Sequence, residues 1–249
     1  MIGKILNSFF DAVRLLTVLP MPKSPEPPRP SLLYWFPLIG ATIGIFLAVT
    51  HEVFFNIFPK TGVLTPILVI VLWLSITRGL HIDGLGDTFD ALGAVADRNR
   101  RLEILRDPHV GTIGTAAVAC VLIGKTMALS AIPLSARVAA LISSAVCARW
   151  MAVIACALFP YARQEGLGAA FIGRARWHHV FLASAAALLF ILIPRGTALS
   201  MIQTSFVIGM GLALISNRAF GGITGDVLGA IIELVECAGL FVFSNLMSR

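Results

Sequence analysis

The chain has 249 residues, of which 57% are hydrophobic and only 13% are charged, and its mean hydropathy is +0.89. These values exclude an ordinary soluble domain and indicate an integral membrane protein. The net charge of +6 is better explained by loops that orient membrane spans and attract anionic lipid or phosphorylated ligands than by nucleic-acid binding. We predict an all-α, polytopic membrane bundle that forms a single domain over residues 1–249.

The first 33 residues are predicted to lie outside the bundle. Apolar and polar residues alternate at helical spacing between positions 5 and 19, which indicates an amphipathic helix at the membrane surface. Six prolines between positions 20 and 30 then predict a stiff, extended linker, because proline fixes φ and lacks a backbone donor.

Seven later segments are apolar over roughly the 20 residues that a bilayer-spanning helix needs. The predicted spans are 34–55, 63–80, 111–131, 137–159, 178–194, 199–215 and 227–246. With the N-terminus inside, 13 basic residues fall on the cytoplasmic side and four on the other, namely Lys60, Arg137, Arg195 and Arg249. The segment 81–110, predicted as a loop, and the turn 221–226 then face the cytoplasm together.

The segment 81–90 holds a histidine and three aspartates. On a helix, the spacing of Asp83, Asp87 and Asp90 puts all three carboxylates on one face, where their like charges repel unless a cation or arginines neutralise them. Carboxylate oxygens favour Mg²⁺, with Mn²⁺ as an alternative, and such a site suits a phosphorylated substrate. The simpler alternative is that Asp83 only caps a helix, which accounts for one aspartate and not three.

Several downstream residues are suited to phosphate binding, because arginines form bidentate contacts and helix starts offer free N–H groups. The candidates are Arg98, Arg101, Arg106, Asp107, Gly111, Thr112, Gly222 and Thr224. A solvated loop whose positive charge keeps it on the cytoplasmic side would explain two or three of the arginines equally well.

Asp226 would join the site from the last helix or cap that helix. Four charged residues fall within spans, as functional groups or as structural partners: Lys125, Arg149, Glu233 and Glu236.

Four motifs in order resemble the cobalamin-5′-phosphate synthase family, also called the adenosylcobinamide-GDP ribazoletransferases. They are 79–87 (GLHIDGLGD), 97–107 (from DR to LRD), 111–114 (GTIG) and 221–230 (GGITGDVLGA). The resemblance implies a Mg²⁺-dependent enzyme of the bacterial cytoplasmic (inner) membrane that joins α-ribazole, or its 5′-phosphate, to adenosylcobinamide-GDP and releases GMP. One departure is Ala91, where glycine is expected after the aspartate.

Mechanistically, the resemblance and the residues together assign metal binding to Asp83, Asp87, Asp90 and Asp226. His81 or a nearby carboxylate would accept the proton of the attacking hydroxyl, or His81 would only support a metal ligand. Two alternatives stay open. One is a CDP-alcohol phosphotransferase, whose acidic signature is only half present here. The other is a cation-coupled transporter that uses the charged residues within the spans.

Overall fold

The computed structural model describes residues 2–24, 27–59, 62–192 and 196–246, and these residues form helices without a β-strand. Lys60, Arg195 and Arg249, used above in the orientation of the spans, lie outside the described residues, as does Pro25 of the linker. The α-helices are α1 (Ile2–Leu16), α2 (Phe36–Ile57), α3 (Leu64–Ile76), α4 (Leu80–Gly93), α5 (Arg98–Ile104), α6 (Thr112–Ala131), α7 (Leu134–Leu158), α8 (Trp177–Ile191), α9 (Ala198–Phe220) and α10 (Gly225–Leu246). Two short 3-10 helices are η1 (Pro30–Trp35) and η2 (Leu167–Ala170).

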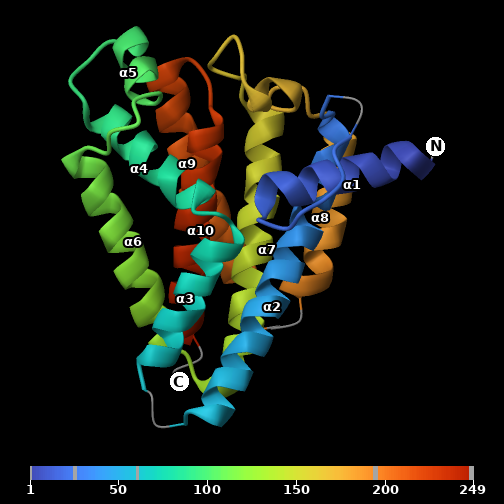
Figure 1. The fold of residues 1–249 in the computed structure, drawn as a ribbon, viewed down its shortest axis with the longest axis vertical. Coiled ribbons are helices and arrows are strands. Elements are labelled where there is room, and N and C mark those ends of the chain that lie inside the picture. Colours follow the sequence, from blue (N-terminus) through green and yellow to red (C-terminus); the bar gives the residue numbers. More distant parts are fainter. Residues whose placement is uncertain (1, 25–26, 60–61, 193–195, 247–249) are drawn as a thin grey trace.

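The predicted N-terminal helix is confirmed as α1, which lies across one side of the bundle (Figure 1). Its inner face buries Ala12, Val13 and Leu16, whereas Ile5 is half exposed. The indole Nε1 of Trp35 donates to Ser8 Oγ at 3.0 Å and so ties α1 to η1. The location of α1 at a membrane surface stays a prediction.

Helices α7 and α10 form the centre of the bundle, since 78% of the most apolar 18-residue stretch of each helix is buried. Glycine allows α2 to approach α7 closely: a Cβ added at Gly40 would lie 2.6 Å from the backbone oxygen of Ala145. Small residues favour such contacts between membrane helices, because there the packing rather than water exclusion drives association.

The predicted count of seven spans is not confirmed. Within the described residues, five helices are long and apolar enough to cross a membrane, and α3 with α4 makes at most a sixth, since the pair is bent by 87°. The segment 178–194 corresponds to α8, which has 15 residues and is therefore about 22 Å long, shorter than a hydrocarbon core of about 30 Å. The segment 81–110 is not a loop either, because most of it forms α4 and α5.

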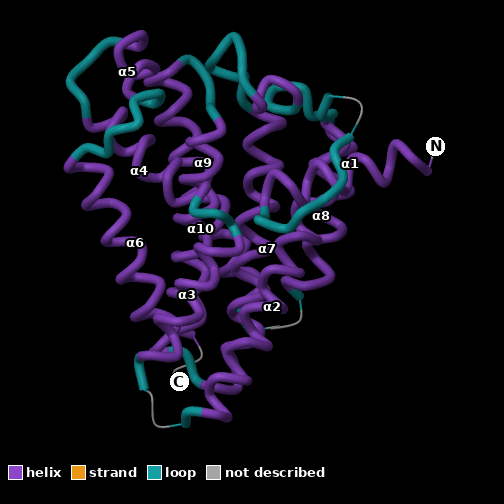
Figure 2. Tube along the Cα trace, in the orientation of Figure 1, coloured by secondary structure: helices purple, strands orange, loops and turns teal. Residues whose placement is uncertain are grey.

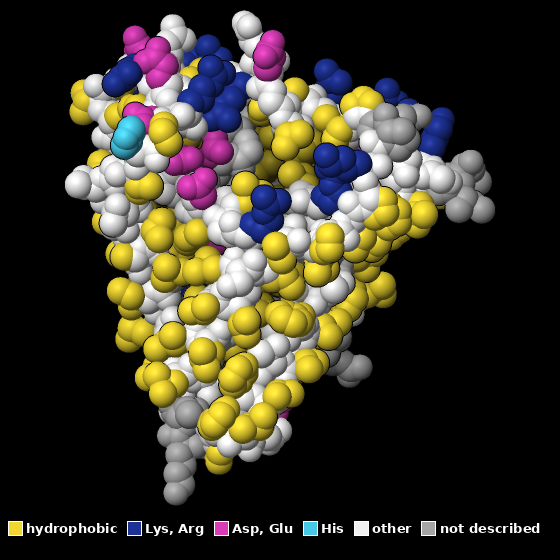
Figure 3. Space-filling model, viewed as in Figure 1, with side chains coloured by type: hydrophobic (Ala, Val, Ile, Leu, Met, Phe, Trp, Pro, Cys, Tyr) yellow, Lys and Arg dark blue, Asp and Glu magenta, His cyan; other side chains and the backbone are white. Residues whose placement is uncertain are grey.

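Most charged side chains gather at one end of the molecule, and apolar side chains predominate among the coloured ones over the rest of the visible face (Figure 3). The longer connections lie at the same end (Figure 2). This separation agrees with the charge distribution used to orient the spans. The assignment of the polar end to the cytoplasm stays a prediction.

Candidate active site

Two helices that are far apart in the sequence build the acidic site. Helix α4 crosses the start of α10 so closely that a Cβ on Gly84 would lie 2.7 Å from the backbone oxygen of Asp226. A Cβ on Gly229 would lie 3.1 Å from the Cα of His81. The two predicted polar segments therefore meet, and Gly84 serves helix packing rather than leaving space for a ligand.

The crossing concentrates negative charge around Asp87. The charges of Asp83, Asp226 and Asp90 all act on its carboxylate, and Arg163 acts with the opposite sign. Asp83 is exposed and Asp87 is half buried, and neither side chain has a hydrogen-bond partner within the described part of the chain. These two carboxylates are consequently free to bind a ligand.

Asp90 has a different environment from the other two aspartates of α4. Its Oδ2 accepts the N–H of Gly111 at 2.7 Å, and its Oδ1 accepts the N–H of Gly114 at 2.8 Å. The carboxylate thus caps the N-terminus of α6 from a neighbouring helix. The anion at the predicted phosphate site of Gly111 is the protein's own aspartate, and the nearby Thr112 is exposed.

Asp226 is oriented by Arg163, whose Nη2 donates to Asp226 Oδ2 at 2.7 Å and to the Leu105 carbonyl at 2.9 Å. Asp226 does not cap α10. The cap is Thr224, whose buried Oγ1 accepts the N–H of Val227 at 3.3 Å and contacts Asp226 Oδ2 at 3.2 Å. The first turn of α10 therefore leaves the Asp226 carboxylate on the side of α4.

Most of the residues predicted to bind phosphate have protein partners. Arg98 Nε donates to the Phe220 carbonyl at 2.6 Å and its Nη2 to that of Ala162 at 3.1 Å, so it holds the end of α9. Arg101 Nε donates to the Ala96 carbonyl at 3.0 Å. The Arg106 side chain is exposed, and no described residue forms a hydrogen bond or ion pair with it.

Two further predicted residues lie in turns. Asp107 accepts hydrogen bonds from the backbone and the ring of His109, which lower the pKa of its carboxyl. Gly222 has a φ of +157°, and a Cβ there would lie 2.5 Å from the Pro160 carbonyl oxygen. Gly222 is buried against neighbouring backbone, whereas Asp107 is exposed, and substrate contact by either residue stays a prediction.

His81 faces the interior of the bundle. It is 3% exposed, its Nδ1 has no partner among the described residues, and the positive charges of Arg149 and Lys125 act on it. His81 is therefore enclosed by the bundle, whereas Asp83, where an incoming hydroxyl would be expected, is exposed.

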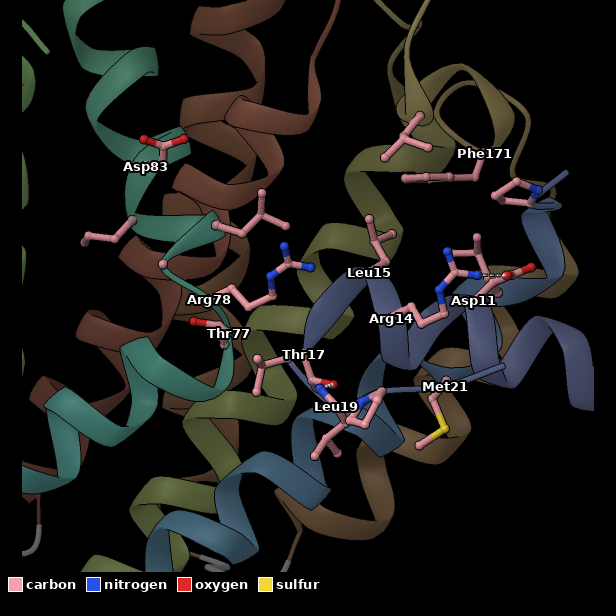
Figure 4. Close-up of a pocket in the computed structure, with 18 of the residues that line it drawn as sticks. Asp11, Arg14, Leu15, Thr17, Leu19, Met21, Thr77, Arg78, Asp83 and Phe171 are labelled. Atoms are coloured by element: carbon pink, nitrogen blue, oxygen red, sulfur yellow. Dashed lines mark hydrogen bonds and ion pairs between the residues drawn. The ribbon is translucent and has the colours of Figure 1, made fainter. Parts of the chain in front are cut away.

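The acidic site opens onto a cavity of about 1310 Å³. Its walls come from α1 and the linker, from the bend between α3 and α4, and from the start of α6. Asp83 and Gly86 belong to its wall, and Figure 4 shows Asp83 opposite the side chains of α1. The cavity exceeds the roughly 300–1,000 Å³ of most small-molecule sites, so it suits a large substrate.

A family model described as cobalamin-5-phosphate synthase matches residues 8–244. The chain belongs to this family. A relative from Chlorobaculum parvum, named adenosylcobinamide-GDP ribazoletransferase, is 35% identical over 96% of this chain and 95% of its own length. A Klebsiella pneumoniae protein of the same name is 36% identical over 93% of this chain and 97% of its own length. No solved structure matches the chain. The resemblance seen in the motifs is confirmed.

One site residue of this cobalamin-5-phosphate synthase family member was not predicted. Arg163 lies in the connection after α7, where its charge was counted only toward the orientation of the spans. No local motif marks it, because its partner Asp226 is 63 residues away in the sequence. The contact arises only from the packing of that connection against the start of α10.

Proposed function

We propose that the protein is a Mg²⁺-dependent adenosylcobinamide-GDP ribazoletransferase that acts in adenosylcobalamin biosynthesis at the cytoplasmic face of the bacterial inner membrane. One observation carries the proposal. Asp83 lies at the wall of a cavity of about 1310 Å³, the charges of Asp83 and Asp226 act on Asp87, and neither Asp83 nor Asp87 has a hydrogen-bond partner among the described residues. Family membership supplies the substrate class.

In the proposed reaction, a hydroxyl oxygen of α-ribazole, or of its 5′-phosphate, attacks the phosphorus that is joined to cobinamide. A new P–O bond forms, the P–O bond to GMP breaks, and GMP leaves with the electron pair. The hydroxyl proton passes to a carboxylate of the site. His81 is not favoured as the acceptor, because its ring is enclosed in the bundle.

The donor set fits Mg²⁺, or Mn²⁺, because it consists of carboxylate oxygens whose mutual repulsion a cation relieves. Among the described residues no group of three His, Cys, Asp or Glu side chains already forms a complete metal site. Asp83, Asp87 and Asp226 are the best candidates, since both oxygens of Asp90 accept hydrogen bonds from α6. When bound, the ion would neutralise charge on the pyrophosphate.

The protein's own residues would then position the substrates. Arg163 holds the Asp226 carboxylate toward α4, and Asp90 fixes the start of α6 beside it. The cavity next to Asp83 would receive the bulky corrinoid. The apolar walls of the cavity would contact the ring system, and the pyrophosphate of the substrate would face the aspartates.

The test is GMP release by purified protein in detergent, given adenosylcobinamide-GDP and α-ribazole, with Mg²⁺ and then with EDTA. We expect Mg²⁺-dependent GMP and a cobalamin product. Asp87→Asn should lower kcat by about 10²-fold or more, the effect of removing one electrostatic group from a site. Glu103→Gln is the matched control, because Glu103 is exposed and, among the described residues, pairs only with Arg100. Near wild-type turnover and Mg²⁺ dependence in Asp87→Asn would overturn the assignment.

A further inference from the structure

The bend between α3 and α4 contains an arginine in an unusual backbone conformation. Two hydrogen bonds close the end of α3: Gly79 N–H donates to the Leu74 carbonyl at 2.9 Å, and Arg78 N–H donates to the Ser75 carbonyl at 3.1 Å. This is the pattern of a Schellman motif, in which the residue after the cap takes the left-handed conformation and is usually glycine. Here that residue is Arg78, with a φ of +58°.

The backbone at this position would favour glycine. A Cβ in the left-handed region crowds the following carbonyl, and among the described residues Arg78 is the sole non-glycine residue with a positive φ. Such strain persists where surrounding structure enforces it, and it gathers at functional sites. The geometry of the turn therefore does not explain an arginine, and its side chain has to be considered.

The Arg78 side chain points into the cavity described above, between α4 and α1 (Figure 4). No described residue forms a hydrogen bond or ion pair with its guanidinium. Elsewhere in the cavity wall, Arg14 and Lys23 add positive charge, and of these two only Arg14 has a close carboxylate among the described residues, Asp11 at 3.7 Å. The cavity thus has an acidic wall at Asp83 and a basic region around Arg78.

We propose that Arg78 is a substrate-binding residue that holds a phosphate group in this cavity. The inference rests on the proposed function and extends it, since the acidic residues alone would not retain a phosphorylated substrate. A planar guanidinium with all its donors free is suited to bidentate contact with phosphate oxygens. Arg78 lies five residues before Asp83, and both residues line the cavity. A phosphate held by Arg78 would therefore lie in the cavity, near the carboxylates of the proposed site. The phosphate belongs either to the pyrophosphate of the GDP-activated substrate or to a 5′-phosphate on the acceptor.

The experiment compares Arg78→Gly, Arg78→Lys and the wild type. Glycine removes the side chain and suits the backbone, so Arg78→Gly should have a melting temperature equal to or above that of the wild type. We expect its KM for one phosphorylated substrate to rise about tenfold or more, with a smaller rise in Arg78→Lys. Arg218→Ala is the control, because Arg218 is an exposed arginine at the end of α9 without a partner among the described residues.

The two phosphate sources are separated by the KM values. A rise for adenosylcobinamide-GDP with either acceptor assigns Arg78 to the pyrophosphate, whereas a rise for α-ribazole 5′-phosphate but not α-ribazole assigns it to the acceptor. Values within twofold of the wild type would overturn the proposal, as would a lowered melting temperature with only kcat reduced. Wild-type protein that releases no GMP would contradict the proposed function instead. Binding of inorganic pyrophosphate by wild type and Arg78→Gly would then still decide whether Arg78 holds phosphate.

Discussion

Asp90 separates two interpretations of the acidic segment, because the sequence predicts a metal ligand and the structure shows a helix cap. Its two oxygens accept N–H groups of α6 at 2.7 and 2.8 Å. Hydrogen bonds to charged groups contribute about 1.5–3 kcal/mol each, and caps replaced by alanine cost about 0.5–2 kcal/mol. Because Asp90→Asn keeps one acceptor oxygen but loses the charge, we expect it to lower the free energy of unfolding by about 2 kcal/mol, and Asp90→Ala by about 3 kcal/mol.

The assay is unfolding in mixed detergent micelles by titration with sodium dodecyl sulfate, followed by tryptophan fluorescence, beside measurement of GMP release. Asp97→Asn is the matched control, because Asp97 caps the exposed helix α5 through a single bond from Arg100 N–H at 2.9 Å. We expect that control to stay within about 0.5 kcal/mol of the wild type. If Asp90→Asn abolishes activity with no loss of stability, the cap interpretation is wrong and direct metal binding is favoured.

Three more variants test the contacts that assemble the site. Arg163→Ala should lower GMP release about tenfold and stability by about 1 kcal/mol, since it frees Asp226 from a 2.7 Å contact, and Arg163→Lys should recover part of the activity. Gly84→Ala should cost about 1–3 kcal/mol in unfolding titrations, whereas Gly211→Ala, with no atom within 4 Å of its added Cβ, should be neutral or stabilising. Lys125→Gln should cost about 3–5 kcal/mol, because it leaves two buried carboxylates with too little positive charge; an unchanged unfolding titration would contradict this.

The long apolar segments were predicted well. Spans predicted at 111–131 and 227–246 correspond to α6 (Thr112–Ala131) and α10 (Gly225–Leu246) within two residues. The bend after α3 was missed because hydrophobicity alone does not report backbone direction. Thr77 and Gly79 interrupt the apolar segment, but no cluster of charged residues marks its end there. The same criterion took the short helix α8 for a full span.

The candidate site was predicted in part, and the difference lies in sequence separation. Helical spacing correctly placed Asp83 and Asp87 together, since that is a local property of α4. The partners of Asp90 and Arg98 lie 21 and 122 residues away, so no local pattern distinguishes an arginine that binds phosphate from one that holds a helix end. Free carboxylates and arginines become apparent only when the tertiary contacts are known.

The buried charges of the bundle explain how the site keeps its geometry. Lys125 of α6 donates to two carboxylates of α10, Glu233 at 2.6 Å and Glu236 at 2.5 Å. Arg149 of α7 also pairs with Glu236. Apolar helix surfaces can shift against one another in a membrane at little hydrophobic cost, whereas buried ion pairs tolerate few arrangements. These pairs fix the position of α10 along α6 and α7. Because Asp226 lies in the first turn of α10 and Asp90 caps the start of α6, the same register aligns the acidic groups at the polar end.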